Sequence, residues 1–408
     1  MSMLVDVSHI FNWHGRLTGI ERVEYHVIQH YFQKSDVQFI RWDSERQEFR
    51  AISREVITSK ILDKPSQVQD STPKQGVYSS SLSGRAVRKL RRTLLPAHTA
   101  KTLHALQDKE FVFNATDEML ILAGLWDDTH YIKAVQRVAK EQLVYHIVYD
   151  MIPIVQPQYV VDYLPDIFKH YMRSVLPLCK GIAAISQSTM KDTQDFLKRE
   201  KLRVPPVQAF RLGDDIDTSH ESSKPEGVKT PYFLSVSTVE ARKNHQLLYY
   251  AYKKAAQDAI TQPPLYIVGR RGWHTEDFQY LIENDPDVKG RIKILDGIED
   301  QQLRWLYQHC NAVIFASFYE GWGLPVAEAL GYGKVVLSSN TSSMIEIGGP
   351  EVVRYFSPFS SDELLAELIS LSGKGAVEKQ ETIIKKRYRT KSWEDATKDL
   401  AKLIESFR

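Results

Sequence analysis

Two glutamates, Glu320 and Glu328, stand eight positions apart on either side of a turn that contains two glycines. The apolar run at residues 312–317 predicts a buried strand before the turn, and Pro325 fits the first turn of a helix after it. Backbone N–H groups at a glycine-rich helix start bind phosphate, and the two carboxylates can accept hydrogen bonds from sugar hydroxyls. The pattern predicts a nucleotide-sugar site. The alternative is a loop in which a carboxylate only caps the helix.

The segment that carries these glutamates resembles the signature of glycosyltransferase family four, a large group of retaining enzymes. The family pattern is E-G-[FW]-G-L-P-x-x-E-A, and residues 320–329 match it throughout. The resemblance implies an α/β protein with the GT-B fold, in which two Rossmann-like domains face a central cleft and a C-terminal helix crosses back to the N-terminal domain. Further similar segments lie in the second half, with weaker ones in the first: 232–245, 264–269, 296–300 and 338–349, then 18–23, 148–153 and 183–188.

Apolar runs alternate with helical patterns in two consecutive sets, which is typical of doubly wound parallel sheets. The alternation predicts one sheet in each half of the chain. The expected strands cover residues 4–7, 37–40, 111–114, 143–149, 182–186 and 207–210 in the first set, and 232–237, 265–268, 292–295, 312–317 and 335–338 in the second.

The chain is long enough for two domains, with 408 residues of which 43% are hydrophobic. Proline, glycine and serine interrupt the pattern after residue 217, where nothing apolar anchors the chain. A basic, turn-rich insertion is expected at about 50–110 within the first domain. We expect an N-terminal acceptor-binding domain at 1–217, a linker at 218–231, a nucleotide-sugar donor domain at 232–391 and a terminal crossover helix at 392–408.

Arg242 and Lys243 directly follow the strand expected at 232–237 and precede a helix that starts near Asn244. Cations at a helix start oppose the helix dipole unless an anion is bound, which favours a diphosphate partner over a surface basic pair. The family has its R-K pair here, and its lysine contacts the diphosphate. Many relatives carry another arginine a few residues earlier, where this chain has serine and threonine. More of the leaving-group charge should therefore fall on Arg242 and Lys243.

Four residues of the first half are candidates for contact with phosphate, sugar or acceptor. Gly19, in a Gly-x-x-x-Gly loop after the first strand, suits the close backbone approach to the donor phosphates that the resemblance implies there. Asp150 ends a buried strand where relatives carry an acidic residue near the transferred sugar. It orients the acceptor hydroxyl or only caps a turn. His146 and Ser186 are candidates for positions near the sugar or acceptor. The alternatives are a core histidine for His146 and a helix cap for Ser186.

The resemblance completes a candidate site. The predicted catalytic residues are Glu320, Lys243, Arg242 and Asp150, and the predicted donor-binding residues are Gly19, Glu328, Gly323, Leu324, Gly269 and Ile298. No Asp-x-Asp motif stands at the end of a strand, so we expect metal-independent transfer without a cofactor.

Composition restricts the partners and the compartment. A net charge of +2 argues against nucleic acid, and two isolated cysteines predict neither a disulfide framework nor a zinc site. The chain has no apolar run of membrane-spanning length and begins with a strand instead of a secretion signal, so we expect a cytoplasmic protein. Five cations within residues 85–95 predict a peripheral contact with the anionic inner face of the cytoplasmic membrane, or else a solvated helix of the insertion.

These observations predict a retaining hexosyltransferase. The expected donor is GDP-mannose, with UDP- or dTDP-hexoses as alternatives, and the expected acceptor is an oligosaccharide or a lipid-linked saccharide in bacterial surface polysaccharide assembly. Another interpretation is a phosphorylase or a sugar-phosphate synthase of the same architecture. A phosphorylase of the glycogen type would need a pyridoxal lysine, and no motif for one occurs. A different class is a non-catalytic GT-B subunit, which would usually lose the acidic and basic residues that Glu320, Glu328 and Lys243 represent here.

Overall fold

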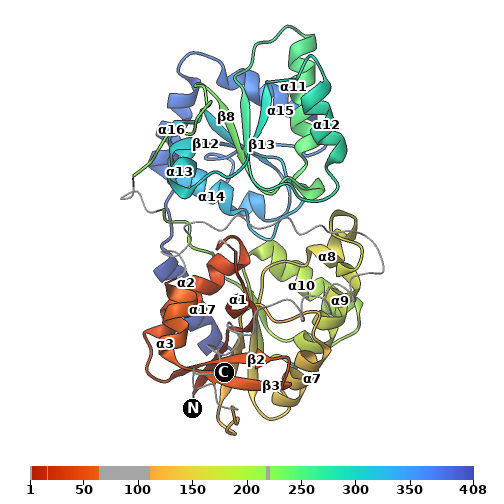
Figure 1. Ribbon diagram of the computed structural model, residues 1–408, viewed down its shortest axis with the longest axis vertical. Coiled ribbons are helices and arrows are strands. Elements are labelled where there is room, and N and C mark those ends of the chain that lie inside the picture. The colour runs from red at the N-terminus through yellow and green to blue at the C-terminus, as the bar shows by residue number, and fades with distance from the viewer. Residues whose placement is uncertain (1, 16, 64–110, 217–220) are drawn as a thin grey trace, which may run out of the picture. The chain divides into compact units, whose positions relative to one another are not determined.

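The computed structural model describes residues 2–15, 17–63, 111–216 and 221–408 (Figure 1). The chain divides into two compact units, Met1–Tyr145 and His146–Arg408. The predicted basic stretch at 85–95 lies outside the described residues. The predicted domain boundaries around 218–231 stay a prediction.

The first sheet has seven strands in the order β3-β2-β1-β4-β5-β6-β7. Strand β1 pairs in parallel with both β2 and β4, so the strand order reverses at β1. Strand β3 runs antiparallel to β2 at one edge. The strands are β1 (Met3–Asp6), β2 (Val37–Asp43), β3 (Glu48–Ile52), β4 (Glu118–Ile121), β5 (Leu143–Val148), β6 (Gly181–Ala184) and β7 (Val207–Ala209).

Helices accompany these strands in both units. Asp128 caps α7 by accepting the backbone N–H groups of His130 and Tyr131, and Ser186 caps α10. The helices are α1 (Ser8–Phe11), α2 (Ile20–Phe32), α3 (Arg54–Ile57), α7 (Thr129–Val138), α8 (Ile152–Val155), α9 (Leu164–Val175) and α10 (Gln187–Arg199), with short turns η1 (Thr58–Leu62), η2 (Pro157–Tyr159) and η3 (Leu176–Leu178).

The second sheet has six strands in the order β10-β9-β8-β11-β12-β13, and all of its pairings are parallel. The order reverses between β8 and β11, which is where open α/β sheets bind ligands at the carboxyl ends of the strands. The strands are β8 (Phe233–Val236), β9 (Leu265–Val268), β10 (Ile292–Leu295), β11 (Ala312–Phe315), β12 (Val335–Ser339) and β13 (Arg354–Phe356).

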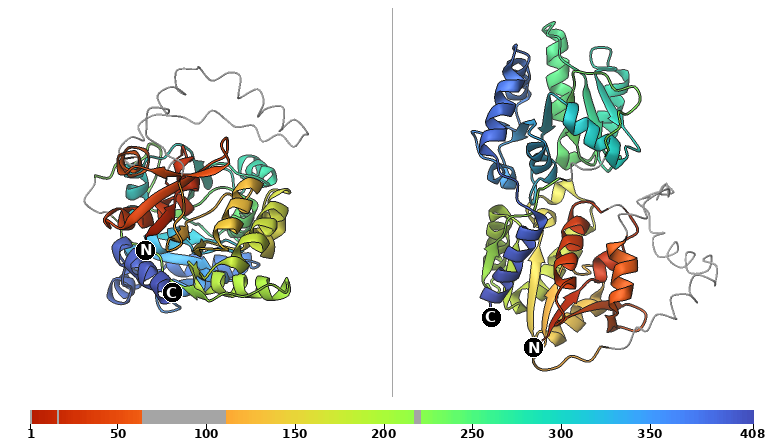
Figure 2. Two further views of the ribbon diagram at one scale, coloured as in Figure 1. Left: turned by 90° about the horizontal axis from the view of Figure 1, so that it is seen from below. Right: turned by 90° about the vertical axis from the view of Figure 1, so that its left-hand side faces the viewer.

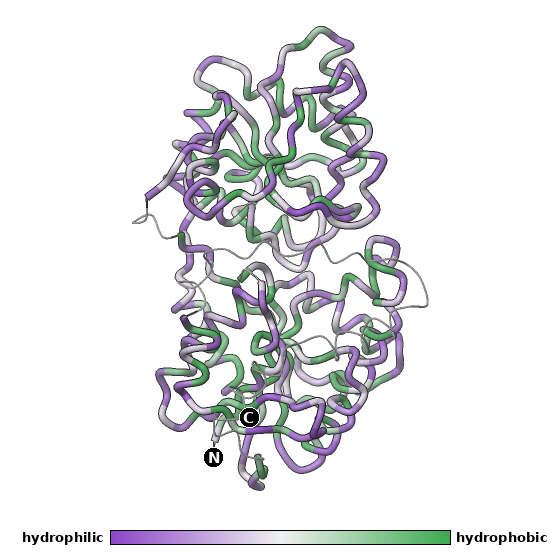
Figure 3. Tube along the Cα trace, viewed as in Figure 1, coloured by the Kyte–Doolittle hydropathy of each residue, from purple (hydrophilic) through white to green (hydrophobic). Residues whose placement is uncertain are grey.

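Helices flank the second sheet, with α11, α12 and α15 together in Figure 1. Strands such as β9 and β11 are buried at every position, and the hydropathy colouring in Figure 3 shows the hydrophobic residues gathered along the strands. The remaining elements are η4 (Ala241–Lys243), α11 (His245–Gln257), α12 (Glu276–Asn284), α13 (Asp300–His309), α14 (Leu324–Gly331), η5 (Ser342–Glu346), α15 (Ser361–Leu371), α16 (Ala376–Arg387) and α17 (Trp393–Ser406).

The terminal helix α17, the dark blue helix that ends at the C label in Figure 2, packs on strand β6 of the first sheet. Two glycines make room for it. A Cβ on Gly181 would lie 2.2 Å from the Phe407 ring, and one on Gly213 would lie 2.6 Å from Trp393. The predicted terminal helix therefore forms and crosses back to the first sheet, as the GT-B fold requires.

Residues 111–114 were predicted to form a strand, and this prediction was wrong. Phe111 donates one backbone hydrogen bond to Phe49 of β3, but Asn114 then turns the chain by donating to the Asp117 carboxylate at 2.8 Å. The strand forms later in the chain, as β4. Its first residue is a buried glutamate, Glu118, which interrupts the apolar pattern expected of a buried strand. Because that side chain accepts a hydrogen bond from Tyr145, its burial is tolerated.

Candidate functional site

The carboxyl ends of β8 and β11 bring the two predicted halves of the site together. Arg242 and Lys243 lie on η4, directly after β8, and Glu320 lies in the loop after β11. Asn244 fixes this geometry because it adopts a left-handed conformation with φ 57° at the start of α11. Its side-chain amide donates to the Ala316 carbonyl at 3.1 Å and to the Pro358 carbonyl at 2.8 Å, so it ties η4 to the next loops.

A compact set of ion pairs surrounds Glu320. Its Oε1 lies 2.5 Å from Lys243 Nζ and its Oε2 lies 2.7 Å from Arg242 Nη1. Arg242 also donates to the Glu240 carboxylate at 2.6 Å and to the Tyr319 carbonyl at 2.8 Å. We call Glu240, Arg242, Lys243 and Glu320 the charge cluster. The structure thus brings together Arg242, Lys243 and Glu320 as the sequence predicts, whereas Glu240 is a member that sequence reasoning missed.

Burial makes this cluster electrostatically strong. The Lys243 and Glu320 side chains are 14% and 10% exposed. Burial alone would raise the pKa of Glu320, but Arg242 and Lys243 outweigh it and lower that pKa to about 2. Burial lowers the pKa of Lys243, although Glu320 opposes that shift. Glu320 is therefore an anion held between two cations that an incoming phosphate could also engage.

A serine-rich segment after β12 supports the Glu320 loop. Ser342 Oγ accepts the backbone N–H of Glu320 at 2.9 Å, and Ser343 Oγ lies 3.0 and 2.5 Å from the Glu320 and Trp322 carbonyl oxygens. These hydroxyls satisfy backbone groups that the irregular loop leaves unpaired. The segment was visible in the sequence as part of the family resemblance, but its supporting role was not predicted.

Five of the six predicted donor-binding residues, all except Gly19, lie at the carboxyl edge of the second sheet. Gly323 has φ 135°, a value that favours glycine, and it precedes Leu324, the first residue of α14. Glu328 lies within α14 as predicted, and its Oε2 accepts a hydrogen bond from Tyr307 Oη at 2.8 Å. Ile298 is half-buried in the loop between β10 and α13. Gly269 follows β9, where a Cβ would lie 1.9 Å from the Ser237 carbonyl oxygen.

Asp150 lies near the charge cluster. Its carboxylate accepts the backbone N–H of Ile152 at 2.9 Å, which is the turn-capping alternative. Burial raises its pKa, and the charges of Arg242, Glu320 and Lys243 reach it as well. Asp150 therefore caps a turn close to the charged groups, and its role toward an acceptor hydroxyl stays a prediction.

Gly321 permits this approach. A Cβ there would lie 2.1 Å from the Tyr149 carbonyl oxygen and 3.0 Å from Asp150 Cβ. Thr189 joins the same backbone segments, since its hydroxyl lies 3.2 Å from the Tyr149 carbonyl and 3.3 Å from the Gly321 carbonyl. The glycine is thus required by close packing of two loops.

Replacing Gly321 with alanine should lower the free energy of unfolding by about 1–3 kcal/mol, the usual cost of overpacking. Denaturant unfolding at pH 7 measures the change. Gly373→Ala is the matched control, because the nearest atom to its Cβ would be 3.5 Å away. Equal unfolding midpoints for the two variants would contradict the close packing at Gly321.

His146 does not join the charge cluster, and its side chain fits the alternative of a core histidine. The side chain is 1% exposed, Nδ1 lies 2.7 Å from the Ile147 carbonyl oxygen, and Nε2 lies 2.8 Å from Tyr171 Oη. Burial lowers its pKa to about 4. Since both ring nitrogens have protein partners, His146 is a core histidine.

Ser186 likewise acts as a helix cap. Its Oγ accepts the Thr189 backbone N–H at 3.0 Å, and the residue is buried. Gly19 belongs to the other unit, where it begins α2 with φ 55° and is exposed. A Cβ on Gly19 would meet nothing within 4 Å, so its backbone is open to a ligand, and its phosphate contact stays a prediction.

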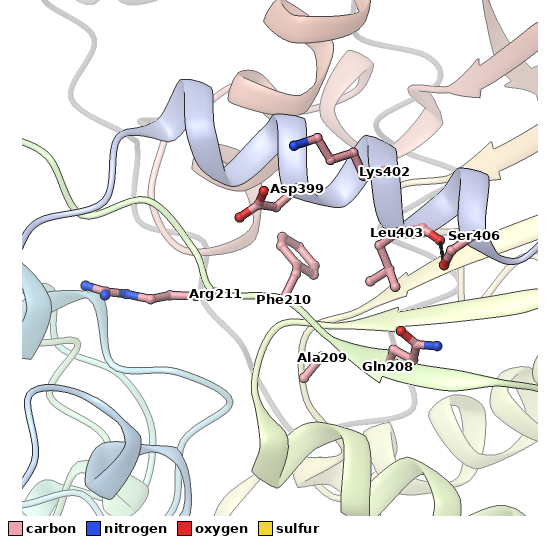
Figure 4. A pocket seen from close by; sticks show the side chains of 8 residues that line it. All are labelled: Gln208, Ala209, Phe210, Arg211, Asp399, Lys402, Leu403 and Ser406. Carbon is pink, nitrogen blue, oxygen red and sulfur yellow. Dashed lines mark hydrogen bonds between the residues drawn. The ribbon is translucent and has the colours of Figure 1, made fainter.

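A hollow of about 430 Å³ lies between α17 and β7 and shares no residue with the charge cluster (Figure 4). Its lining is Gln208, Ala209, Phe210, Arg211, Asp399, Lys402, Leu403 and Ser406. Among the described residues, no group of three or more histidine, cysteine or acidic side chains is placed to hold a metal ion. No helix in the described parts of the chain is long and apolar enough to cross a membrane. Both cysteines are free and buried.

Comparisons with known proteins agree with this geometry. Residues 217–390 match the model of the family "Glycosyl transferases group 1". The serotype-specific mannosyltransferase WbdA of Escherichia coli is 27% identical over 197 residues, which are 45% of this chain and 24% of that protein. The O-antigen chain mannosyltransferase B of Escherichia coli is 36% identical over 118 residues, which are 29% of this chain and 31% of that protein. The match therefore spans only about a quarter of WbdA.

Solved structures share the fold along the whole chain. Anabaena HepE in complex with UDP and glucose aligns over 100% of both chains with a TM-score of 0.59 and 13% identity. The sucrose-phosphate synthase of Thermosynechococcus elongatus aligns over 99% of this chain and 98% of its own, with a TM-score of 0.58 and 13% identity. At this identity the likeness concerns the fold alone. Residues 217–390 therefore match the model of the glycosyl transferases group 1 family, within a chain that has the GT-B fold.

Proposed function

We propose that this chain is a retaining hexosyltransferase that moves mannose from GDP-mannose to a saccharide or lipid-linked acceptor in bacterial surface polysaccharide assembly. The observation that carries the proposal is the buried Glu320 between Arg242 and Lys243 at the point where the second sheet reverses its strand order. The names of the WbdA and O-antigen relatives support mannose as the transferred sugar.

The charge cluster has the chemistry that such a transfer needs. When the donor bond breaks, negative charge develops on the departing diphosphate and positive character on the sugar. Lys243 and Arg242 would offset the phosphate charge. Because the diphosphate competes with Glu320 for these cations, donor binding would release Glu320 oxygens to accept hydrogen bonds from sugar hydroxyls. Glu328 would bind the ribose, and Asp150 would orient the acceptor hydroxyl.

The proposal includes metal independence and retention of configuration. Activity should survive excess EDTA, because Lys243 and Arg242 supply the positive charge that a divalent cation would otherwise provide. The new linkage should keep the anomeric configuration of the donor. NMR of the product measures the configuration. A strict Mn²⁺ or Mg²⁺ requirement, or an inverted product, would overturn this part of the mechanism.

Release of nucleotide diphosphate, measured across GDP-, UDP- and dTDP-sugars without acceptor, tests the function and identifies the donor. A UDP-hexose is the second candidate, favoured by the UDP and glucose held by HepE, which shares the fold. We expect GDP-mannose to give the fastest release. No release from any nucleotide sugar, with or without saccharide acceptors, would favour a non-catalytic subunit.

We further propose that residues 85–95 tether this cytoplasmic enzyme to the inner face of the cytoplasmic membrane, near its acceptor. Each cation near an anionic surface contributes about 1 kcal/mol, and salt screens the attraction within a Debye length of about 8 Å. Sedimentation with phosphatidylglycerol vesicles at low salt should recover the wild type but not a variant with four of the cations changed to glutamine. Equal partitioning of the two proteins would reject the tether. The substituted residues are Arg88, Lys89, Arg91 and Arg92.

A further inference from the structure

A histidine and a buried glutamate form a pair where β1 ends in the first sheet. His9 lies on α1, three residues after β1, and its Nδ1 is 2.6 Å from Glu24 Oε2 on α2. Because β1 pairs in parallel with β2 and β4, the pair lies where the strand order of this sheet reverses. Such a position is the general ligand-binding edge of open α/β sheets.

Burying the Glu24 carboxylate lowers the stability of the fold unless other groups compensate its charge. Its side chain is 0% exposed, while the His9 side chain is 29% exposed. Within the described ranges, Glu24 Oε1 has no hydrogen-bond partner. A buried carboxylate with an unpartnered oxygen lowers stability, and such groups concentrate at functional sites. The arrangement therefore places a deep carboxylate behind a partly exposed imidazole.

A second polar network holds α1, and with it His9, in place. The Asp6 carboxylate accepts the backbone N–H of Ser8 at 2.9 Å and the hydroxyl of Tyr131 at 2.6 Å. Ser8 Oγ accepts the backbone N–H of Trp42 at 2.8 Å. These bonds connect β1, α1, β2 and α7. The His9 ring is thus oriented both by its helix and by Glu24.

We infer that His9 binds a sugar hydroxyl through Nε2 and that Glu24 is a positioning residue that fixes the ring and its tautomer. This inference rests on the proposed function. With Nδ1 directed to Glu24, Nε2 accepts a hydrogen bond when the ring is neutral and donates one when it is protonated. A hydroxyl can serve either state. A phosphate fits less well, because the charges of Glu24, Glu21 and Asp6 all reach this ring.

Substitutions of His9 separate its two nitrogens. His9→Gln can place its amide near the Nε2 position, whereas His9→Asn reaches only the Nδ1 position. We expect His9→Ala and His9→Asn to raise one substrate KM about tenfold, the effect of losing one hydrogen bond, and His9→Gln to restore most of it. Glu24→Gln keeps an acceptor for Nδ1–H but removes the charge, so it should raise the same KM while the melting temperature stays equal or rises.

The kinetic pattern identifies which sugar is bound. An increase confined to the acceptor KM, with donor hydrolysis unchanged, assigns the hydroxyl to the acceptor. An increase in donor KM together with slower donor hydrolysis assigns it to the donor sugar. Wild-type values of both KM in His9→Ala would overturn the inference while leaving the proposed function standing.

If the wild type processes no nucleotide sugar, the proposed function fails. NMR then tests separately whether His9 binds a sugar. The His9 imidazole signals of the wild-type protein should shift when methyl α-mannoside or GDP-mannose is added, and inorganic phosphate should leave them in place. Unshifted signals with both sugar probes would reject His9 as a sugar-binding residue.

Discussion

Lys243→Ala should lower kcat/KM for the nucleotide-sugar donor roughly 30- to 150-fold, or about 2–3 kcal/mol of transition-state stabilisation. The Lys243 side chain is 14% exposed, and its ammonium nitrogen lies 2.5 Å from Glu320 Oε1, at the edge where the donor diphosphate should bind. The fold should survive the change. Glu320 keeps its 2.7 Å ion pair with Arg242, so the substitution leaves no buried charge without a partner.

Steady-state kinetics with the donor found in the nucleotide-sugar screen would measure this effect. Lys254→Ala is the matched control, because Lys254 also forms an ion pair, with Asp362, but is 45% exposed and lies on α11, the helix that follows η4. Surface ion pairs contribute little, so this variant should retain wild-type kinetics. A Lys243→Ala enzyme as active as Lys254→Ala would refute the phosphate role of Lys243.

Glu320→Ala and Glu320→Gln should each cost at least about 2–3 kcal/mol in kcat/KM, since both lose the anion proposed to face the sugar. They should also lower stability by about 3–5 kcal/mol, because Lys243 remains buried without its carboxylate and Arg242 keeps only Glu240. Glu328→Ala is the kinetic comparison. A ribose contact binds ground state and transition state alike, so this change should raise donor KM more than it lowers kcat. Wild-type kcat/KM in the Glu320 variants would remove Glu320 from the mechanism.

The pH dependence gives Glu320 a second signature. Its folded-state pKa of about 2 lies below the ordinary value of 4.5. The carboxylate therefore stabilises the fold fully above pH 4.5, and this stabilisation declines as the pH falls toward 2. The unfolding free energy of the wild type should decrease more between pH 5 and pH 3.5 than that of Glu320→Gln. Parallel pH profiles would contradict the buried ion pairs.

Local patterns predicted the second half of the chain well. Glu320 and Lys243 each follow a parallel strand and Glu328 lies just past the first turn of the next helix, so a short window of sequence contains the information that positions them. Strands β9 and β10 were predicted to the residue for the same reason. The family resemblance assigned Lys243 and the glutamate loop to one site although they are 77 positions apart, and their direct ion pair was not predicted.

Features that depend on contacts between distant segments could not be predicted in this way. Nothing in the local sequence distinguishes Glu240 from an ordinary polar residue. Its role depends on Arg242, which forms ion pairs with both Glu240 and Glu320. The His9–Glu24 pair depends on how α1 packs against α2. His146 shares the strand pattern of Asp150, but only the position of Tyr171 on α9 shows that its ring is already bound in the core.

Isothermal titration of nucleotides into the wild type and Lys243→Ala tests the central claim most directly. GDP and GMP share a base and a ribose and differ by one phosphate, so their comparison isolates the diphosphate contact; UDP and UMP replace them if the donor is a UDP-sugar. The account predicts that Lys243→Ala weakens GDP binding at least about tenfold and leaves GMP binding nearly unchanged. Equal affinities of the two proteins for GDP would contradict a diphosphate site at Lys243 and Glu320.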